Sequence, residues 1–433
     1  MALLQQASVL ARSAFAASGL VSSRLARAIA SSSNSQAAAA QPLAAEDEGP
    51  AEPRWSRELG AIRTDWTREE VTDVYNLPLL DLVFKAASVH RMYNDPAMVQ
   101  RCTLLSIKTG GCPENCNYCS QSSHWSEDTG LKAEKLMDLE PVYEAALRAR
   151  EAGSTRFCMG AAWRGPSQVG PRQWSRVLEM VRRIRGLGME VCTTLGMLTP
   201  EQARELREAG LTAYNHNLDT SPEYYGQITT TRKYEDRLST LAAVRDAGIS
   251  VCAGGIIGLG EGPQDRVGLL LQLATLPEHP ESVPINRLVA VKGTPLQNQE
   301  PPSGLDLVRC IATARIVMPR TVVRLSAGRL DLSSAEQALA FMAGANSIFD
   351  GDKLLTTPNN DRNEDEQMFE LLGLRSRPAF LNYPSGNETS RDFAAAGSPS
   401  SSSSSSSSSE ASSSSSGCCG GGCGSKQQQQ ATA

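Results

Sequence analysis

Residues 233–253, KYEDRLSTLAAVRDAGISVCA, contain the element from which the fold of this chain can be predicted. Apolar side chains in the first part recur with the spacing of an amphipathic helix, at Leu238, Leu241, Ala242 and Val244. We expect the helix to end before Gly248, because glycine just past a helix adopts a left-handed conformation that other residues avoid. The β-branched run 249–253 follows directly and predicts a strand. The element is therefore a helix, a glycine and a strand.

The same element recurs along the chain. Other helix-length segments end in Ala-Gly or Leu-Gly at Gly153, Gly188, Gly210 and Gly344. With three further β-branched runs they predict eight strands, at residues 102–107, 155–158, 189–194, 211–217, 249–253, 283–289, 321–325 and 345–349. Alternating strands and helices favour parallel pairing, so we predict an α/β fold, a (β/α)8 TIM-type barrel. An open, doubly wound sheet is the alternative, and residues 66–98 are expected to form capping helices.

The two ends of the chain differ from this core. Residues 1–45 contain no acidic residue and are rich in Ala and Ser, with arginines at Arg12, Arg24 and Arg27. That composition is typical of an organelle transit peptide. Residues 386–433 are rich in Ser, Gly and Gln and are expected to be disordered, because they offer little apolar surface to bury. One barrel domain is therefore expected over residues 55–385.

The composition excludes several classes of protein. The chain has 42 basic and 47 acidic side chains among 433 residues, and a net charge of -5 argues against a binder of nucleic acid or of anionic membranes. The sequence has no run of about 18 apolar residues, so it does not predict a membrane-spanning helix. Eleven cysteines are far too few for a small disulfide scaffold. The positions of the cysteines are therefore more informative than their number.

Three cysteines lie on one loop directly after the first predicted strand. Residues 110–120 read GGCPENCNYCS, in which Cys112, Cys116 and Cys119 have C-x3-C-x2-C spacing. A structural zinc ion requires four protein ligands, and His124 is the nearest further candidate. An iron–sulfur cluster held by only three cysteines would instead leave one iron open to a substrate. The spacing predicts a metal centre and leaves both alternatives open.

Three more cysteines lie on separate predicted strands. Cys158, Cys192 and Cys252 would each, taken alone, be interpreted as a small buried residue. Taken together, they could meet inside the barrel and supply three ligands to a second iron–sulfur centre. Cys102 and Cys310 are interpreted as residues of the hydrophobic core.

Two segments, one polar and one a glycine-rich loop, follow predicted strands and could hold organic ligands. In residues 214–221, YNHNLDTS, the side chains of Asn215, Asn217 and Asp219 alternate and so share one face of an extended chain. Amides and a carboxylate suit ribose hydroxyls or a cyclic urea, although the same residues also favour turns. Residues 254–261 have the pattern G-x-I-x-G-x-x-E, whose spacing does not match a dinucleotide-binding loop.

The cysteine loop, with Tyr118 before its last cysteine, resembles the radical S-adenosylmethionine superfamily, and with Lys108 it is similar to the biotin synthase family. The resemblance implies a [4Fe–4S] cluster on Cys112, Cys116 and Cys119, whose open iron binds S-adenosyl-L-methionine. The cluster would reduce this cofactor to a 5'-deoxyadenosyl radical that abstracts hydrogen from the substrate. The resemblance also implies a [2Fe–2S] cluster, with ligands Cys158, Cys192, Cys252 and Arg324.

The resemblance further implies which residues contact the organic ligands. The residues it assigns to S-adenosylmethionine are Tyr118, Asn217, Asp219, Gly258 and Glu261. Those it assigns to the substrate, dethiobiotin, are Asn215, Asn217 and Asn286. No general acid or base is implied, because radical hydrogen abstraction requires none.

The implied activity is that of a sulfur transferase, which inserts sulfur into dethiobiotin to form biotin. The implied partners are a ferredoxin-type electron donor, the iron–sulfur assembly machinery and a second copy of the chain in a homodimer, with neither nucleic acid nor membrane. The implied location is the mitochondrion, with the plastid as the alternative. Two other functions stay open: a different radical S-adenosylmethionine barrel enzyme, and a zinc-stabilised binding protein without turnover.

Overall fold

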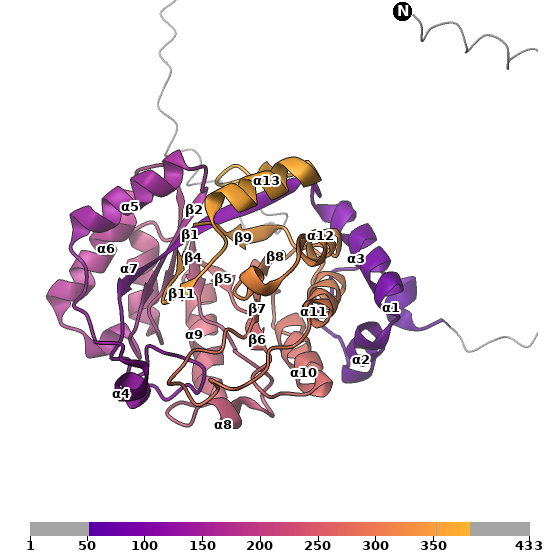
Figure 1. The fold of residues 1–433 in the computed structure, drawn as a ribbon, viewed down its shortest axis with the longest axis horizontal. Helices are drawn as coiled ribbons and strands as arrows, with labels where there is room; N and C mark the ends of the chain where they lie inside the picture. Colours follow the sequence, from indigo (N-terminus) through magenta and orange to yellow (C-terminus); the bar gives the residue numbers. More distant parts are fainter. Residues whose placement is uncertain (1–51, 352, 382–433) are drawn as a thin grey trace, which may run out of the picture. The chain divides into compact units, whose positions relative to one another are not determined.

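The computed structural model describes residues 52–351 and 353–381, which form one barrel with its helices (Figure 1). The predicted transit peptide, 1–45, and the predicted disordered tail, 386–433, lie outside the described residues. Within the described part of the chain, no helix is both long enough and apolar enough to cross a membrane.

Parallel strands close into a barrel, as predicted. Eight of them form its wall: β1 (Met98–Lys108), β2 (Arg156–Ala161), β3 (Glu190–Thr194), β4 (Ala213–Asn215), β5 (Ser250–Cys252), β7 (Ser282–Arg287), β8 (Val322–Leu325) and β9 (Ser347–Phe349). Each pairs with the next in this order, and β1 pairs with both β2 and β9. This last pairing closes the sheet, so the alternative of an open, doubly wound sheet is wrong.

One strand between β5 and β7 was not predicted. β6 (Gly255–Ile257) extends the line of β5 and pairs with β7, with Gly255 opposite Ile285. The glycine-rich sequence after residues 249–253 predicts a loop here instead. β4 is conversely shorter than predicted, since the chain beyond Asn215 leaves the ladder and bonds instead to the loop after β5, as in the Leu218 N–H to Gly254 bond of 2.9 Å.

Helices surround the strands (Figure 1). Those that precede β1 are α1 (Arg54–Arg57), α2 (Arg68–Asn76) and α3 (Leu79–Tyr93), which confirm the predicted capping helices. Those between strands are α4 (Ser126–Thr129), α5 (Leu139–Glu151), α6 (Pro171–Arg185), α7 (Pro200–Glu208), α8 (Tyr225–Ile228), α9 (Tyr234–Asp246), α10 (Pro263–Ala274), α11 (Gly304–Val317) and α12 (Ser334–Met342). After β9 come a hairpin of β10 (Lys353–Leu354) and β11 (Thr357–Pro358), then α13 (Arg362–Leu372) and β12 (Arg375–Ser376).

Local sequence explains where the helices begin and end. The side chains of Thr199, Ser303 and Ser333 cap α7, α11 and α12, and the backbone N–H of each cap residue donates in return to the side chain of the third helical residue. The glycines predicted to end helices all have positive φ: Gly153 89°, Gly188 78°, Gly210 93°, Gly248 71° and Gly344 104°. The repeating helix, glycine and strand element is therefore confirmed at each of these positions.

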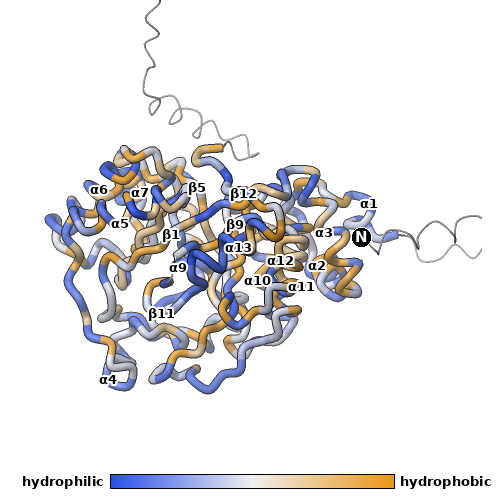
Figure 2. Tube along the Cα trace, turned by 45° about the horizontal axis from the view of Figure 1, so that its top comes forward, coloured by the Kyte–Doolittle hydropathy of each residue, from blue (hydrophilic) through white to orange (hydrophobic). Residues whose placement is uncertain are grey.

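The outer helices are amphipathic, and Figure 2 shows hydrophilic and hydrophobic residues alternating along them. On α6 the buried residues are Val177, Leu178, Met180, Val181 and Ile184. The hydrophobic core therefore lies between the helices and the outer face of the barrel, and the interior of the barrel remains for other side chains.

A buried polar layer closes the amino-terminal end of the barrel interior. Arg156 and Glu190 form an ion pair of 2.6 Å with both side chains inaccessible to solvent, and Gln100 Nε2 donates to Glu190 at 3.0 Å. Burial alone would raise the pKa of Glu190, but the positive charges of Arg156 and Arg377 hold it below its usual value. Two residues further along the same three strands lie Cys102, Cys158 and Cys192. This polar layer therefore lies directly below these three cysteines, on the amino-terminal side of the barrel interior.

Gly254 joins β5 to β6, and Gly254→Ala is expected to lower the free energy of unfolding by about 2–3 kcal/mol. A Cβ there would overlap the carbonyl oxygen of Pro284 and lie 2.9 Å from its Cδ, so β6 and β7 would have to separate. Gly226→Ala is the control, because a Cβ at Gly226 has no heavy atom within 4 Å. Urea denaturation of both variants tests the prediction, and equal stability would contradict it.

Candidate functional site

A cavity of about 330 Å³ opens at the carboxyl ends of the barrel strands. Its wall is built from residues at or just after the ends of several strands, including Ala162, Thr194, Asn215, Asn286 and Ser326. In (β/α)8 barrels this end carries the active site, because the loops after the strands converge there. The predicted site residues are therefore expected on this surface.

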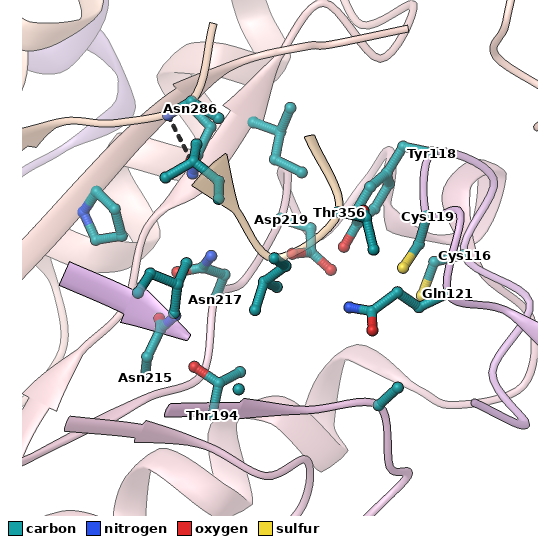
Figure 3. Close-up of a pocket in the computed structure, with 18 of the residues that line it drawn as sticks. Cys116, Tyr118, Cys119, Gln121, Thr194, Asn215, Asn217, Asp219, Asn286 and Thr356 are labelled. Atoms are coloured by element: carbon teal, nitrogen blue, oxygen red, sulfur yellow. Dashed lines mark hydrogen bonds between the residues drawn. The ribbon is translucent and has the colours of Figure 1, made fainter. Parts of the chain in front are cut away.

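The cysteine loop after β1 forms one side of the cavity, and Cys112, Cys116 and Cys119 all line it. Figure 3 shows the sulfur atoms of Cys116 and Cys119 beside each other, next to Gln121. The turn is held by a 3.0 Å bond from Cys119 N–H to the Cys116 carbonyl. Burial raises the pKa of Cys119 to about 12 and raises that of Cys116. The thiols therefore need nearby positive charge to ionise as metal ligands.

Arg232 supplies that charge, and the sequence analysis did not identify it. Its Nη2 donates to Cys116 Sγ at 3.2 Å. The contact follows from the way the cysteine loop is anchored: Asn115 Oδ1 accepts bonds from the backbone N–H groups of Thr230 and Thr231, at 2.9 and 3.2 Å. The segment before α9 is thereby fixed against the loop, which places the next residue, Arg232, beside the thiols.

The polar segment after β4 crosses the cavity, and the side chains of Asn215, Asn217 and Asp219 all line it, as the alternation predicted. Figure 3 shows the two asparagines across the cavity from Cys116 and Cys119. Asn217 Oδ1 accepts a bond from Gly254 N–H at 3.2 Å. Asn215 Oδ1 is buried and has no hydrogen-bond partner within the described part of the chain. A buried amide oxygen without a partner is costly, so it is suited to a ligand.

Asp219 is held by a buried ion pair with Arg237, another residue that the sequence analysis did not identify. Its backbone has φ of 67°, a left-handed conformation that Asp tolerates better than most residues. The segment therefore contains a turn as well as an extended face, and both interpretations of these residues are partly correct.

Asn286 lies at the end of β7 and also lines the cavity. Its Nδ2 donates to the carbonyl of Gly255 at 2.9 Å, and its Oδ1 accepts from Ala327 N–H at 3.2 Å. The side chain therefore connects β6 with the loop after β8 and borders the cavity at the same time.

Gly258 and Glu261 do not line the cavity, although both belong to the described part of the chain. The Glu261 carboxylate accepts from the N–H groups of Gly258 at 2.8 Å and Leu259 at 2.6 Å, and pairs with Arg266 at 2.8 Å. The carboxylate therefore stabilises the loop after β6, and direct contact of these two residues with S-adenosylmethionine stays a prediction.

The strand cysteines lie deeper in the barrel. Cys158, Cys192 and Arg324 line the cavity, and Cys252 is fully buried beside them. A hydrogen bond with Cys192 lowers the pKa of Cys252 to about 7 against the effect of burial, and the charge of Arg324 adds to this. Three thiols and one guanidinium from four strands therefore meet in the barrel interior, which is the arrangement that a second cluster requires.

The two cysteines interpreted as core residues have different surroundings. Cys310 is confirmed in the core, on α11, where its sulfur lies 3.9 Å from the hydroxyl of Tyr75. Cys102 is buried too, but it packs against Cys158 and Cys192 inside the barrel. The interpretation of Cys102 as ordinary core is therefore incomplete.

Comparison with known proteins agrees with this site. Residues 106–273 match the model of the radical SAM superfamily, and residues 284–375 match that of the biotin and thiamin synthesis associated domain. The mitochondrial biotin synthase of Arabidopsis thaliana is 60% identical over 336 residues, covering 77% of this chain and 88% of that protein. The biotin synthase of Cytophaga hutchinsonii is 59% identical over 321 residues, covering 74% of this chain and 94% of that protein. The chain belongs to the biotin synthase family.

Biotin synthases are radical S-adenosylmethionine enzymes that insert sulfur, and they use a [4Fe–4S] cluster, S-adenosylmethionine and a [2Fe–2S] cluster. The predicted family, class of enzyme and cofactors are therefore confirmed. The alternatives of another radical enzyme and of a zinc-stabilised binding protein are not supported. The roles of individual residues stay predictions.

Solved structures show the same fold in other enzymes. Methylornithine synthase superposes with a TM-score of 0.61 at 19% identity, covering 76% of this chain and 96% of that one. A maturase of the [FeFe]-hydrogenase superposes with a TM-score of 0.64 at 19% identity, covering 76% of this chain and 77% of that one. The predicted barrel is therefore a known architecture.

The residues present fit two clusters. Across the described ranges, no three His, Cys, Asp or Glu side chains are grouped so as to hold a single metal ion. A cluster has different requirements, because its ligands are spread around several atoms. In a [4Fe–4S] cluster each cysteine binds a different iron, and in a [2Fe–2S] cluster each iron takes two protein ligands. Both cysteine sets face interior space and have an arginine within reach, which suits an anionic cluster.

Proposed function

We propose that this chain converts dethiobiotin to biotin by inserting one sulfur atom. In this proposal Cys112, Cys116 and Cys119 hold the [4Fe–4S] cluster, and the ligands of the [2Fe–2S] cluster are Cys158, Cys192, Cys252 and Arg324. The proposal is supported above all by one observation: cysteines of both sets line one cavity, together with the amide and carboxylate side chains. When bound, the clusters and S-adenosylmethionine supply the radical chemistry and the sulfur.

The protein's own residues position the reactants. Asn217 and Asp219 offer acceptors to the ribose hydroxyls of S-adenosylmethionine, and the ion pair with Arg237 fixes the carboxylate. Tyr118 borders the same part of the cavity. Asn215 and Asn286 offer amide groups to the ureido ring of dethiobiotin, which has both donors and acceptors. Arg232 stabilises the thiolate of Cys116 and offers a cation to the carboxylate of S-adenosylmethionine.

The hairpin of β10 and β11 encloses the cavity on its remaining side. Leu355 and Thr356 at its tip line the cavity, and the hydroxyls of Thr356 and Ser120 are 3.0 Å apart. Enclosure excludes water and prevents side reactions of a reactive intermediate.

Anaerobic turnover tests the proposed function. The reconstituted protein, given dethiobiotin, S-adenosylmethionine and a reductant, is expected to form biotin, and its iron and sulfide content should exceed that of one cluster per chain. Formation of 5'-deoxyadenosine without biotin would indicate a different radical reaction, and a colourless zinc protein would contradict the proposal entirely.

Asn215→Ala is expected to weaken binding of dethiobiotin about tenfold, the effect of losing one hydrogen bond of roughly 1.4 kcal/mol to a ligand. The Asn215 Oδ1 has no partner among the described residues, so its loss should leave the melting temperature almost unchanged. Asn286→Ala is the matched comparison, because that side chain bonds to Gly255 and Ala327 and its loss should also lower stability. The apparent KM for dethiobiotin measures the effect, and an unchanged KM in Asn215→Ala would contradict it.

The family and the sequence also suggest the partners of the enzyme and its location in the cell. We propose that a ferredoxin-type protein supplies electrons, that the iron–sulfur assembly machinery supplies clusters, and that two copies form a homodimer. Residues 1–45 are proposed to direct the chain to the mitochondrion, supported by their composition and by the mitochondrial relative from Arabidopsis thaliana, with the plastid as the alternative. Residues 55–385 are proposed as the catalytic barrel and 386–433 as a disordered tail.

A further inference from the structure

Cys102 is a fourth thiol inside the barrel, next to the proposed site of the second cluster. It lies on β1, opposite Arg156 of β2 and Phe349 of β9, and no part of it is exposed to solvent. Its side chain packs with Cys158 and Cys192 in one cluster of buried residues. The inward face of β1 continues past it to Leu104, which lines the cavity.

The contacts of Cys102 connect it to Arg324. Arg324 Nη2 lies 3.3 Å from Cys102 Sγ, while Nε of the same guanidinium donates to Ser347 Oγ at 3.0 Å. The sulfur also lies 3.6 Å from Gln100 Oε1 and 3.7 Å from Ser347 Oγ. The charge of Arg324 also acts on Cys158 and Cys252. A group bound where Arg324 meets these cysteines is therefore close to the sulfur of Cys102.

The chemistry of the two side chains differs in one respect. Arginine is cationic and must lose a proton before it can donate a lone pair, and nitrogen from a guanidinium is an uncommon ligand for iron. Thiolate is the usual ligand of [2Fe–2S] clusters, which normally have four cysteines. The barrel interior thus contains a complete set of four cysteines, and the Arg324 guanidinium lies against the fourth.

We propose that Cys102 is a reserve ligand of the second cluster, held by the guanidinium of Arg324 and able to replace Arg324 as the fourth ligand. On replacement the proton of the thiol passes to the departing guanidine of Arg324, which becomes a cation again, and the thiolate sulfur binds the iron that Arg324 leaves. The ligands of the cluster then carry one more negative charge than with a neutral arginine, which lowers the reduction potential of the cluster. The proposal rests on the proposed function, since it requires the second cluster to be bound at Cys158, Cys192 and Cys252.

Four anaerobically reconstituted proteins test it: wild type, Arg324→Ala, and Arg324→Ala combined with either Cys102→Ala or Cys310→Ala. Cys310 is the matched control, a buried cysteine on α11 outside the barrel interior. Mössbauer spectroscopy counts each cluster type, and the reduction potential of the [2Fe–2S] signal is measured. We expect Arg324→Ala to keep the second cluster at a more negative potential, and only the additional loss of Cys102 to remove it.

The possible results distinguish failure of the role of Cys102 from failure of the proposed function. Retention of the second cluster without Arg324 and Cys102, or its loss in Arg324→Ala alone, would overturn the role of Cys102. Absence of the second cluster in the wild type would instead contradict the proposed function. The [4Fe–4S] content of each variant reports whether the barrel has folded, and Arg324→Met, which keeps most of the side-chain volume, repeats the test if Arg324→Ala fails to fold.

Discussion

Cys116→Ala is expected to abolish the cleavage of S-adenosylmethionine. The loop after β1 supplies three thiols to the cavity, and two cannot hold a cluster that requires three. Loss of a group outside the ligand shell already costs about 10–100-fold in metal affinity or activity, so loss of a ligand should cost more than about a hundredfold. The measurement is the rate of 5'-deoxyadenosine formation with a chemical reductant, together with the iron content.

The fold should tolerate this substitution. The backbone carbonyl of Cys116, which accepts bonds from Cys119 N–H at 3.0 Å and Trp125 Nε1 at 3.2 Å, is unchanged in the variant. Cys310→Ala removes a buried thiol far from the cysteine loop in the sequence and should retain the wild-type rate. Continued formation of 5'-deoxyadenosine by Cys116→Ala would refute the assignment of the first cluster.

Much of the fold could be predicted because its signals are local. A glycine such as Gly210 or Gly344 ends its helix through its own backbone conformation. The apolar face expected for α9 is only partly correct, because Leu241 and Val244 are buried but Ala242 is exposed. β6 was missed for the opposite reason. Gly254 just before it and Gly255 at its start resemble a loop, and its pairing with β7 depends on residues about 30 positions apart, Gly255 and Ile285.

The residues of the candidate site also fall into two groups, those that sequence spacing predicts and those that it does not. Cysteines on one loop and polar residues at alternate positions can be recognised from spacing, and the cavity includes most of them. Arg232, Arg237 and Cys102 have no such spacing. Arg232 reaches Cys116 only because Asn115 fixes two distant segments together. Cys102 meets the other thiols only because β1 presents its side chain to the barrel interior. Such residues are visible only once the chain is folded.

The position of Cys252 leads to a second large effect. It lies at the end of β5 and is fully buried, and the backbone around it is fixed by the bond from His216 N–H to its carbonyl at 2.9 Å. Alanine keeps that bond and leaves only a small void, with an expected cost of about 1–2 kcal/mol in stability. The barrel and the cysteine loop after β1 should therefore remain intact in Cys252→Ala.

Cys252→Ala should consequently lose the [2Fe–2S] cluster and keep the [4Fe–4S] cluster. Cys102 cannot replace it, because β1 lies across the eight-stranded barrel from β5, with β2, β3 and β4 between them on one side. Reductive cleavage of S-adenosylmethionine should then persist while biotin formation falls below detection, since no sulfur is available. Mössbauer spectra and parallel assays of 5'-deoxyadenosine and biotin measure both effects. An intact [2Fe–2S] spectrum in this variant would show that the second cluster is bound elsewhere, whereas loss of both clusters would show that the two sites are not independent.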